Sequence, residues 1–186
     1  MAGSLAIRRA GAVIRAGGVV AYPTEAVWGL GCDPSNAAAV ARILALKERP
    51  ASMGLILIAA DAGQLEPWVE PVSGEVRSRI AATWPGPVTW VLPAQSGVPA
   101  WLHGGRGTLA VRVTAHAQAA ALCRATGFAI VSTSANRSGH PPARNAAQVR
   151  RWFGDELDLI LGGATGGLDR PSEIRDAATG RPLRSG

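Results

Sequence analysis

Hydrophobic and polar residues along this chain follow two alternating periods, one typical of helices and one typical of strands. A helical spacing of apolar residues, ended by glycine or proline, predicts helices at 5–16, 36–48, 73–84, 116–126 and 145–152. Short apolar or β-branched runs predict strands at 19–22, 54–60, 88–92, 108–113, 128–131 and 157–161, and two more follow residue 171. This alternation predicts an α/β fold with one twisted, mixed sheet and flanking helices, in a single domain spanning residues 1–186.

Three glycine- and proline-rich stretches are predicted to be loops. The first, 23–34, contains apolar side chains and places the hydroxyl of Thr24 just past a strand end; alternatively, it only plugs one edge of the sheet. The second covers 95–107, where His103 is expected to make a hydrogen bond within the loop. The third, 162–167, resembles a phosphate cradle only loosely, because no Lys-Ser/Thr pair follows it.

A polar row follows the apolar strand that begins at Phe128. Because side chains alternate along an extended backbone, Ser132, Ser134 and, if the extension continues, Asn136 point to one side. Open α/β sheets bind ligands at such strand ends. The alternative is a polar turn that merely caps the strand.

Three cationic residues occupy positions that the hydrophobic pattern assigns to the interior or its border. Lys47 continues the buried stripe of its helix; it either reaches solvent and complements the helix dipole, or aims its ammonium into a site. With Arg49, two residues on, it is a candidate polyphosphate clamp. Arg112 lies on a cleanly alternating strand; it needs an anionic partner if buried, or it faces water on an edge strand.

Composition indicates a folded, basic protein. The chain is 47% hydrophobic with a net charge of +6, carried almost wholly by arginine, since Lys47 is the only lysine. This balance permits an anionic partner, either a nucleotide or RNA.

The remaining composition bears on where the protein acts. Cys32 and Cys123 form no metal-binding spacing and no disulfide framework, which favours a reducing cytosol and a cytoplasmic location. The longest apolar run, 55–60, is too short to span a bilayer, so no membrane partner is expected. An arginine-bearing N-terminus faintly mimics a transit peptide, but its removal would cut into the first predicted helix and strand.

Seven segments, in order, resemble the YrdC/TsaC family, the threonylcarbamoyl-AMP synthases. They are Pro-Thr-Glu-Ala-Val-Trp-Gly-Leu-Gly at 23–31, Leu-Lys-Glu-Arg-Pro at 46–50, Gly-Leu-Ile-Leu-Ile at 54–58, Trp-Pro-Gly-Pro-Val-Thr at 84–89, Leu-Ala-Val-Arg-Val at 109–113, Ser-Thr-Ser-Ala-Asn at 132–136 and Pro-Ser-Glu-Ile-Arg-Asp at 171–176. Together they cover nearly the whole chain and are most similar to the short bacterial form. The resemblance implies a twisted α/β sheet with a large, basic, concave cavity.

The resemblance also implies an activity. Members of the family are ATP-dependent nucleotidyltransferases that make L-threonylcarbamoyladenylate and pyrophosphate from L-threonine, bicarbonate and ATP. Their product is used for N6-threonylcarbamoyladenosine at position 37 of tRNA, so a downstream threonylcarbamoyl transferase complex is an expected partner. Mg²⁺ is expected to arrive with ATP, because no dedicated carboxylate cage is visible in the sequence.

The family's motifs assign roles to individual residues of this chain. The paired motifs Lys-x-Arg and Ser-x-Asn imply that Lys47 and Arg49 are catalytic. Residues matching ATP-binding positions are Lys47, Arg49, Thr108, Ser134, Asn136 and Arg184. Residues matching threonine-binding positions are Thr24, Arg112, Ser132 and Ser172. Longer relatives carry a histidine near the amino acid, where this chain has only the aliphatic residues 56–59.

Two competing functions remain open from the sequence. The first is a non-catalytic protein that binds double-stranded RNA or tRNA, which the basic charge favours; the six tryptophans, however, are scattered and form no stacking ladder. The second is a cysteine hydrolase using Cys32, which lies in the predicted 23–34 loop. No His/Asn pattern of such a hydrolase accompanies it.

Overall fold

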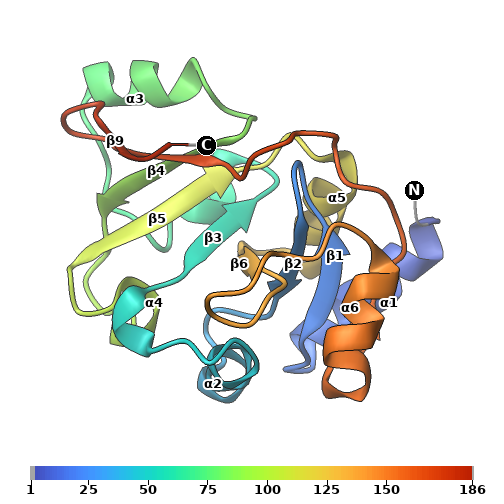
Figure 1. Ribbon diagram of the computed structural model, residues 1–186. Coiled ribbons are helices and arrows are strands. Elements are labelled where there is room, and N and C mark those ends of the chain that lie inside the picture. The colour runs from blue at the N-terminus through green and yellow to red at the C-terminus, as the bar shows by residue number, and fades with distance from the viewer. Residues whose placement is uncertain (1–2, 186) are drawn as a thin grey trace.

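The computed structural model describes residues 3–185, and within them nine strands form one mixed sheet with helices on both faces (Figure 1). The strand order is β7-β1-β2-β6-β3-β5-β4-β8-β9. The strands are β1 Val20–Pro23, β2 Trp28–Gly31, β3 Ile56–Ala59, β4 Val88–Pro93, β5 Thr108–Val113, β6 Ile130–Ser134, β7 Leu159–Ile160, β8 Glu173–Asp176 and β9 Pro182–Arg184. The predicted α/β class and mixed sheet are confirmed.

Four of the six α-helices in residues 3–185 begin at a side chain that caps the first turn. Asn36 accepts a hydrogen bond from Ala39 N, and Asn145 accepts one from Gln148 N, so each satisfies a free amide in the first turn. The helices are α1 Ser4–Arg15, α2 Ala37–Leu46, α3 Gly74–Ala81, α4 Ala100–His103, α5 Ala117–Thr126 and α6 Ala146–Phe153. Short 3₁₀ turns are η1 Ala51–Met53, η2 Ala62–Leu65 and η3 Gly154–Glu156.

Alternation along the central strands divides the core into two layers. In β3, Leu57 belongs to the apolar cluster that includes residues of α2 and α6, whereas its neighbour Ile58 belongs to the cluster that includes residues of α1 and α5. Val131 and Ile130 of β6 divide in the same way. Each face of the sheet is therefore covered by helices over part of its area.

Two segments predicted as irregular contain regular structure. The 23–34 stretch was predicted as a loop, but it forms a hairpin in which β2 pairs antiparallel with β1 and all four residues of β2 are buried. Gly29 and Gly31 led to the prediction of a loop, because glycine is depleted in strands. A side chain at Gly31 would have its Cβ 2.7 Å from Val131 O, so the backbones approach too closely for anything larger. The 95–107 loop likewise contains the short helix α4.

The strand β5 lies inside the sheet, between β3 and β4, and not at an edge. It pairs parallel with β3, with Arg112 opposite Ile58. The exposed-edge interpretation of Arg112 is therefore wrong, and the alternative that requires a buried anionic partner applies.

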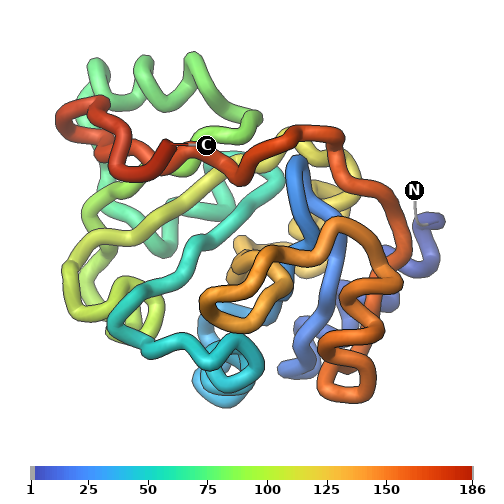
Figure 2. The backbone as a smooth tube through the Cα atoms, in the orientation of Figure 1, coloured from blue at the N-terminus to red at the C-terminus, as the bar shows by residue number. Residues whose placement is uncertain are grey.

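The segment 162–172, here called the strap, joins β7 at one edge of the sheet to β8 near the other (Figure 2). It bonds to the β1–β2 turn, since Gly166 N donates to Thr24 O and Leu168 N donates to Glu25 O, both at 3.0 Å. The glycine-rich run 162–167 contains no helix or strand, as predicted for a loop, and the strap is hydrogen-bonded to the turn that carries Thr24.

Candidate active site

A cavity of about 250 Å³ opens beside the β1–β2 turn, at the polar end of β6. It is walled by residues that are distant in the sequence but adjacent in the sheet. The lining includes Thr24, Glu25, Arg49, Gly54, Arg112, Ser132, Ser134, Ser172 and Arg184. Seven of the ten residues predicted from sequence to form the site are in this wall, so the fold brings most of them together.

Three guanidinium groups, those of Arg49, Arg112 and Arg184, concentrate positive charge in this wall. Arg49 Nη2 donates to Gly54 O at 3.1 Å, and Arg184 Nη2 donates to Ser172 O at 2.8 Å, so backbone carbonyls hold both side chains. Burial lowers the pKa of Arg49, and the charges of Arg106 and Arg184 lower it further. Groups that repel one another in this way favour an anion between them.

Arg112 is buried, with 5% of its surface exposed, and its partner is Glu25, which is 8% exposed. Arg112 Nη1 lies 2.6 Å from Glu25 Oε2, but without the alignment of a hydrogen bond. The other carboxylate oxygen, Oε1, accepts hydrogen bonds from Thr114 Oγ1 at 2.6 Å and Ala115 N at 3.2 Å. The wall thus contains an ionised pair whose facing atoms lack directed hydrogen bonds.

Burial raises the pKa of Glu25, but the Arg112 charge and the Thr114 hydrogen bond lower it more, so the net pKa lies below its ordinary 4.5. A depressed carboxyl pKa stabilises the fold above the unfolded pKa, and this contribution is lost as pH falls through the folded value. We therefore expect the stability difference between wild type and Glu25→Gln to shrink below pH 4.5. Chemical unfolding of both proteins at pH 7, 5 and 3.5 measures it; a constant difference would contradict the assignment.

Lys47 is 3% exposed and reaches neither solvent nor the cavity wall. Its ammonium donates to three oxygens of the segment after β6: Ser134 O at 2.5 Å, Asn136 O at 2.9 Å and Asn136 Oδ1 at 3.1 Å. Burial and then the Arg49 charge lower its pKa to about 8, although these acceptors favour the charged form. In this arrangement Lys47 fixes the turn that ends β6, directly behind the wall.

The predicted polar row of Ser132, Ser134 and Asn136 is confirmed for the two serines only. Ser132 and Ser134 line the cavity, but β6 ends at Ser134 and the backbone then turns. Asn136 lies outside the wall, where its Oδ1 accepts from Ser134 Oγ at 2.6 Å and its amide donates to His140 O at 2.7 Å. The extension expected through Asn136 is therefore wrong, and this side chain orders the turn together with Lys47.

The remaining predicted residues differ in position. Thr24 lines the cavity, with its hydroxyl donating to Val27 O at 2.7 Å. Ser172, at the end of the strap, lies 3.3 Å from the Thr89 hydroxyl. Thr108 begins β5 and is not in the wall, so its contact with ATP stays a prediction.

Comparisons with known proteins identify the family of this chain. The Sua5/YciO/YrdC model, described as telomere recombination, matches residues 12–186. This chain belongs to that family. It is 61% identical over 178 residues to the threonylcarbamoyl-AMP synthase of Halorhodospira halophila, covering 96% of this chain and 93% of the relative. The corresponding protein of Nitrosococcus oceani is 60% identical, with 96% of both chains covered.

A solved structure of the family gives the same fold. P. abyssi Sua5 in complex with L-threonine superposes with a TM-score of 0.89 and 37% identity. The match covers 97% of this chain and 53% of that one, so this chain spans about half of Sua5.

Glu25 is the wall residue that the sequence did not single out. In the sequence, the segment that contains Glu25 drew attention only for the hydroxyl of Thr24. The ion-pair partner of Glu25, Arg112, lies 87 residues further along the chain in β5. An acidic residue inside an otherwise buried run between two strands was the available signal, since a buried carboxylate needs a cation.

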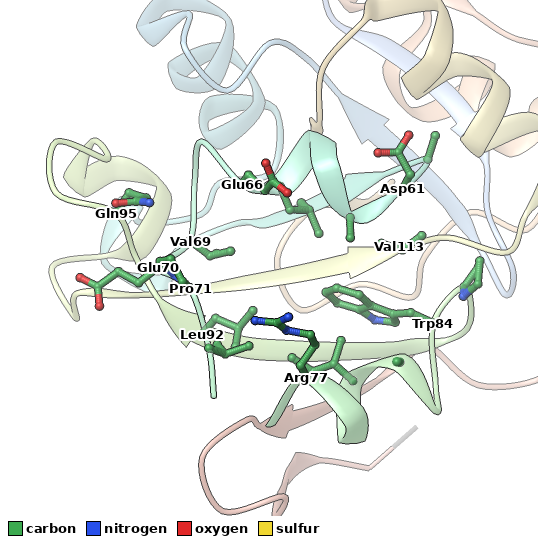
Figure 3. A pocket seen from close by; sticks show the side chains of 17 residues that line it. Asp61, Glu66, Val69, Glu70, Pro71, Arg77, Trp84, Leu92, Gln95 and Val113 are labelled. Atoms are coloured by element: carbon green, nitrogen blue, oxygen red, sulfur yellow. The ribbon is translucent and has the colours of Figure 1, made fainter. Parts of the chain in front are cut away.

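A larger groove of about 790 Å³ lies on the opposite face of β5, where Val113 lines it (Figure 3). Its floor and walls are mostly apolar, with Leu92 and Trp84 among the lining side chains. Asp61, Glu66 and Glu70 stand in its lining, and Arg77 is its one basic residue. This charge balance disfavours phosphates, so size alone does not make the groove the family's site.

Cys32 directly follows β2, is fully buried in the apolar core and does not line the cavity. Burial raises the pKa of its thiol to about 12, so the thiolate needed for nucleophilic attack is absent at neutral pH. We expect Cys32→Ala to leave turnover within about twofold of wild type. A pyrophosphate-release assay on the folded variant measures this; loss of activity without loss of stability would restore the hydrolase hypothesis.

Among residues 3–185, no helix combines the length and the apolar character needed to cross a bilayer.

Proposed function

We propose that this protein is an L-threonylcarbamoyladenylate synthase, a nucleotidyltransferase that converts L-threonine, bicarbonate and ATP to threonylcarbamoyl-AMP and pyrophosphate. One observation carries the proposal: a single small cavity gathers Arg49, Arg112 and Arg184 around two strand-end serines, with one carboxylate among them. Guanidinium groups bind phosphates and carboxylates with a matching planar fork. Neutral hydroxyls orient such ligands without repelling them.

The reaction needs positioning more than covalent help from the protein. The amine of threonine and bicarbonate give a carbamate with loss of water. A carbamate oxygen then bonds to the α-phosphorus of ATP as the bond from that phosphorus to pyrophosphate breaks. Negative charge grows on the phosphate oxygens, and fixed guanidinium groups stabilise it. Arg49 and Arg184 are the wall residues assigned this role, with Lys47 behind them.

The amino acid is assigned to the inner end of the cavity. Arg112 would pair with its carboxylate or with the carbamate, while Thr24, Ser132 and Ser172 surround it. The aliphatic residues 56–59 leave no histidine at this end, and β3 contributes apolar surface instead.

Mg²⁺ is proposed to arrive with ATP. Glu25, the one carboxylate of the described cavity wall, is already paired with Arg112, so phosphate oxygens and water would supply most of the ligands. When bound, the ion neutralises charge on the triphosphate. The product would pass to a threonylcarbamoyl transferase complex acting on tRNA, and direct binding of RNA is tested separately below.

Incubation with ATP, bicarbonate and L-threonine, with pyrophosphate followed over time, tests the proposal. We expect release that depends on threonine and bicarbonate, with L-serine a poorer substrate. Salt-sensitive RNA binding without ATP turnover would instead favour the RNA-binding alternative.

A further inference from the structure

Glu25 is out of place in a site built only for anions. Every other charged side chain in the described cavity wall is an arginine, and a carboxylate there weakens attraction for phosphates. Support for Arg112 is one reason for its presence. It leaves Glu25 Oε2 and Arg112 Nη1 in contact at 2.6 Å without hydrogen-bond alignment, and Arg112 Nε buried without a hydrogen-bond partner.

The contacts of the pair show how each oxygen of the Glu25 carboxylate is held. Glu25 Oε1 is used by Thr114 Oγ1 and Ala115 N, so the backbone and a neighbouring hydroxyl fix the carboxylate. Oε2 lies 2.6 Å from Arg112 Nη1. Buried polar atoms without aligned partners are rare in folded proteins. A ligand that bonded to both side chains would satisfy them.

We propose that Glu25 and Arg112 together form a receptor for a zwitterionic α-amino acid, with Glu25 holding the ammonium and Arg112 the carboxylate. This inference rests on the proposed function and adds a specificity role for Glu25. The two side chains part as the amino acid enters, and each meets a ligand charge opposite to its own. Because the internal pair and the zwitterion each have zero net charge, the exchange buries no uncompensated charge.

The receptor accounts for how one cavity accepts both substrates. Three guanidinium groups alone would repel an ammonium, so an amino acid would bind less well than its deaminated analogue. Glu25 reverses this preference at the inner end and leaves Arg49 and Arg184 for the triphosphate. A site built around a charged hydrogen bond rejects analogues that lack the partner group.

Calorimetry on the unmodified protein tests the receptor with three probes. L-threonine carries both charges, 2,3-dihydroxybutanoate of the same configuration lacks the ammonium, and L-threonine methyl ester lacks the carboxylate. We expect both single-charge analogues to bind at least about tenfold more weakly than threonine, the usual cost of a lost charged hydrogen bond. Equal affinity for threonine and the dihydroxy acid would overturn the proposal.

Variants separate the effect of the Glu25 charge from the support that Glu25 gives to the surrounding structure. Glu25→Gln should weaken threonine binding by about tenfold or more and leave binding of the dihydroxy acid unchanged or tighter, so the preference collapses. Thr114→Val removes one hydrogen bond to the same carboxylate but keeps the charge, and should retain the preference. Glu48→Gln, on an exposed carboxylate paired with Arg137, is the matched control and should bind as wild type.

The outcomes distinguish the inference from the function. If wild type releases pyrophosphate with threonine but Glu25→Gln loses both ligands equally, Glu25 only supports Arg112 and the inference fails alone. If wild type neither binds nor turns over threonine, both fail. Should Glu25→Gln not fold, the three-probe comparison on wild type still decides the matter.

Discussion

Replacing Lys47 with alanine is expected to lower turnover by about a hundredfold or more, and to destabilise the fold at the same time. The ammonium donates to three oxygens of the turn after β6, so its loss leaves buried acceptors without a partner. This should cost about 3 kcal/mol, or roughly 6–12 °C in Tm. Pyrophosphate release and thermal unfolding measure the two effects.

The control for Lys47 lies in α2, the helix that Lys47 caps at its C-terminal end. Arg42 makes an exposed ion pair with Asp158 at 2.6 Å, and Arg42→Ala should cost less than about 1 kcal/mol with no effect on turnover. Near-normal pyrophosphate release from Lys47→Ala would contradict a role in catalysis. Normal stability with lost turnover would show that the ammonium leaves the turn and acts on the phosphates directly.

Arg112→Leu is expected to cost about 3–5 kcal/mol of stability, because it leaves the Glu25 carboxylate buried without a cation. The double change Arg112→Leu with Glu25→Gln should recover part of that loss, since no charge then remains buried. Urea unfolding of the two single variants and the double variant measures the coupling. Additive losses would show that the two groups do not interact.

Arg112→Lys examines function with the charge retained. The fork of the guanidinium is lost, so KM for threonine should rise by about tenfold or more while KM for ATP changes little. Arg137→Lys, on an exposed arginine paired with Glu48 and Glu156, is the control. Equal changes in both KM values would remove Arg112 from the amino-acid end.

Local sequence patterns predicted the elements well where one signal dominated. The alternation at 108–113 matches β5 from its first residue to its last. Asn145 begins α6 as its capping chemistry suggested. By contrast, β2 was missed because its glycines serve a close approach to β6, and the demand for that approach comes from another strand.

The site was predictable in its residue types and less so in its contacts. Motif positions brought Arg49, Ser134 and Arg184 into one wall, but Lys47 and Asn136 support that wall from behind. No local pattern shows that Lys47 bonds to carbonyls 87 and 89 residues further on. The pairing of Glu25 with Arg112 was equally invisible, because it depends on the order of strands across the sheet.

The cavity draws its wall from both halves of the chain, from the β1–β2 turn through to Arg184 in β9. Such a wall exists only once the most sequence-distant segments have met, a late event when long loops must close. A substrate therefore has no binding site on a partly folded chain and stabilises only the native fold. Saturating ATP and threonine should therefore lower the rate of unfolding and leave the rate of folding nearly unchanged.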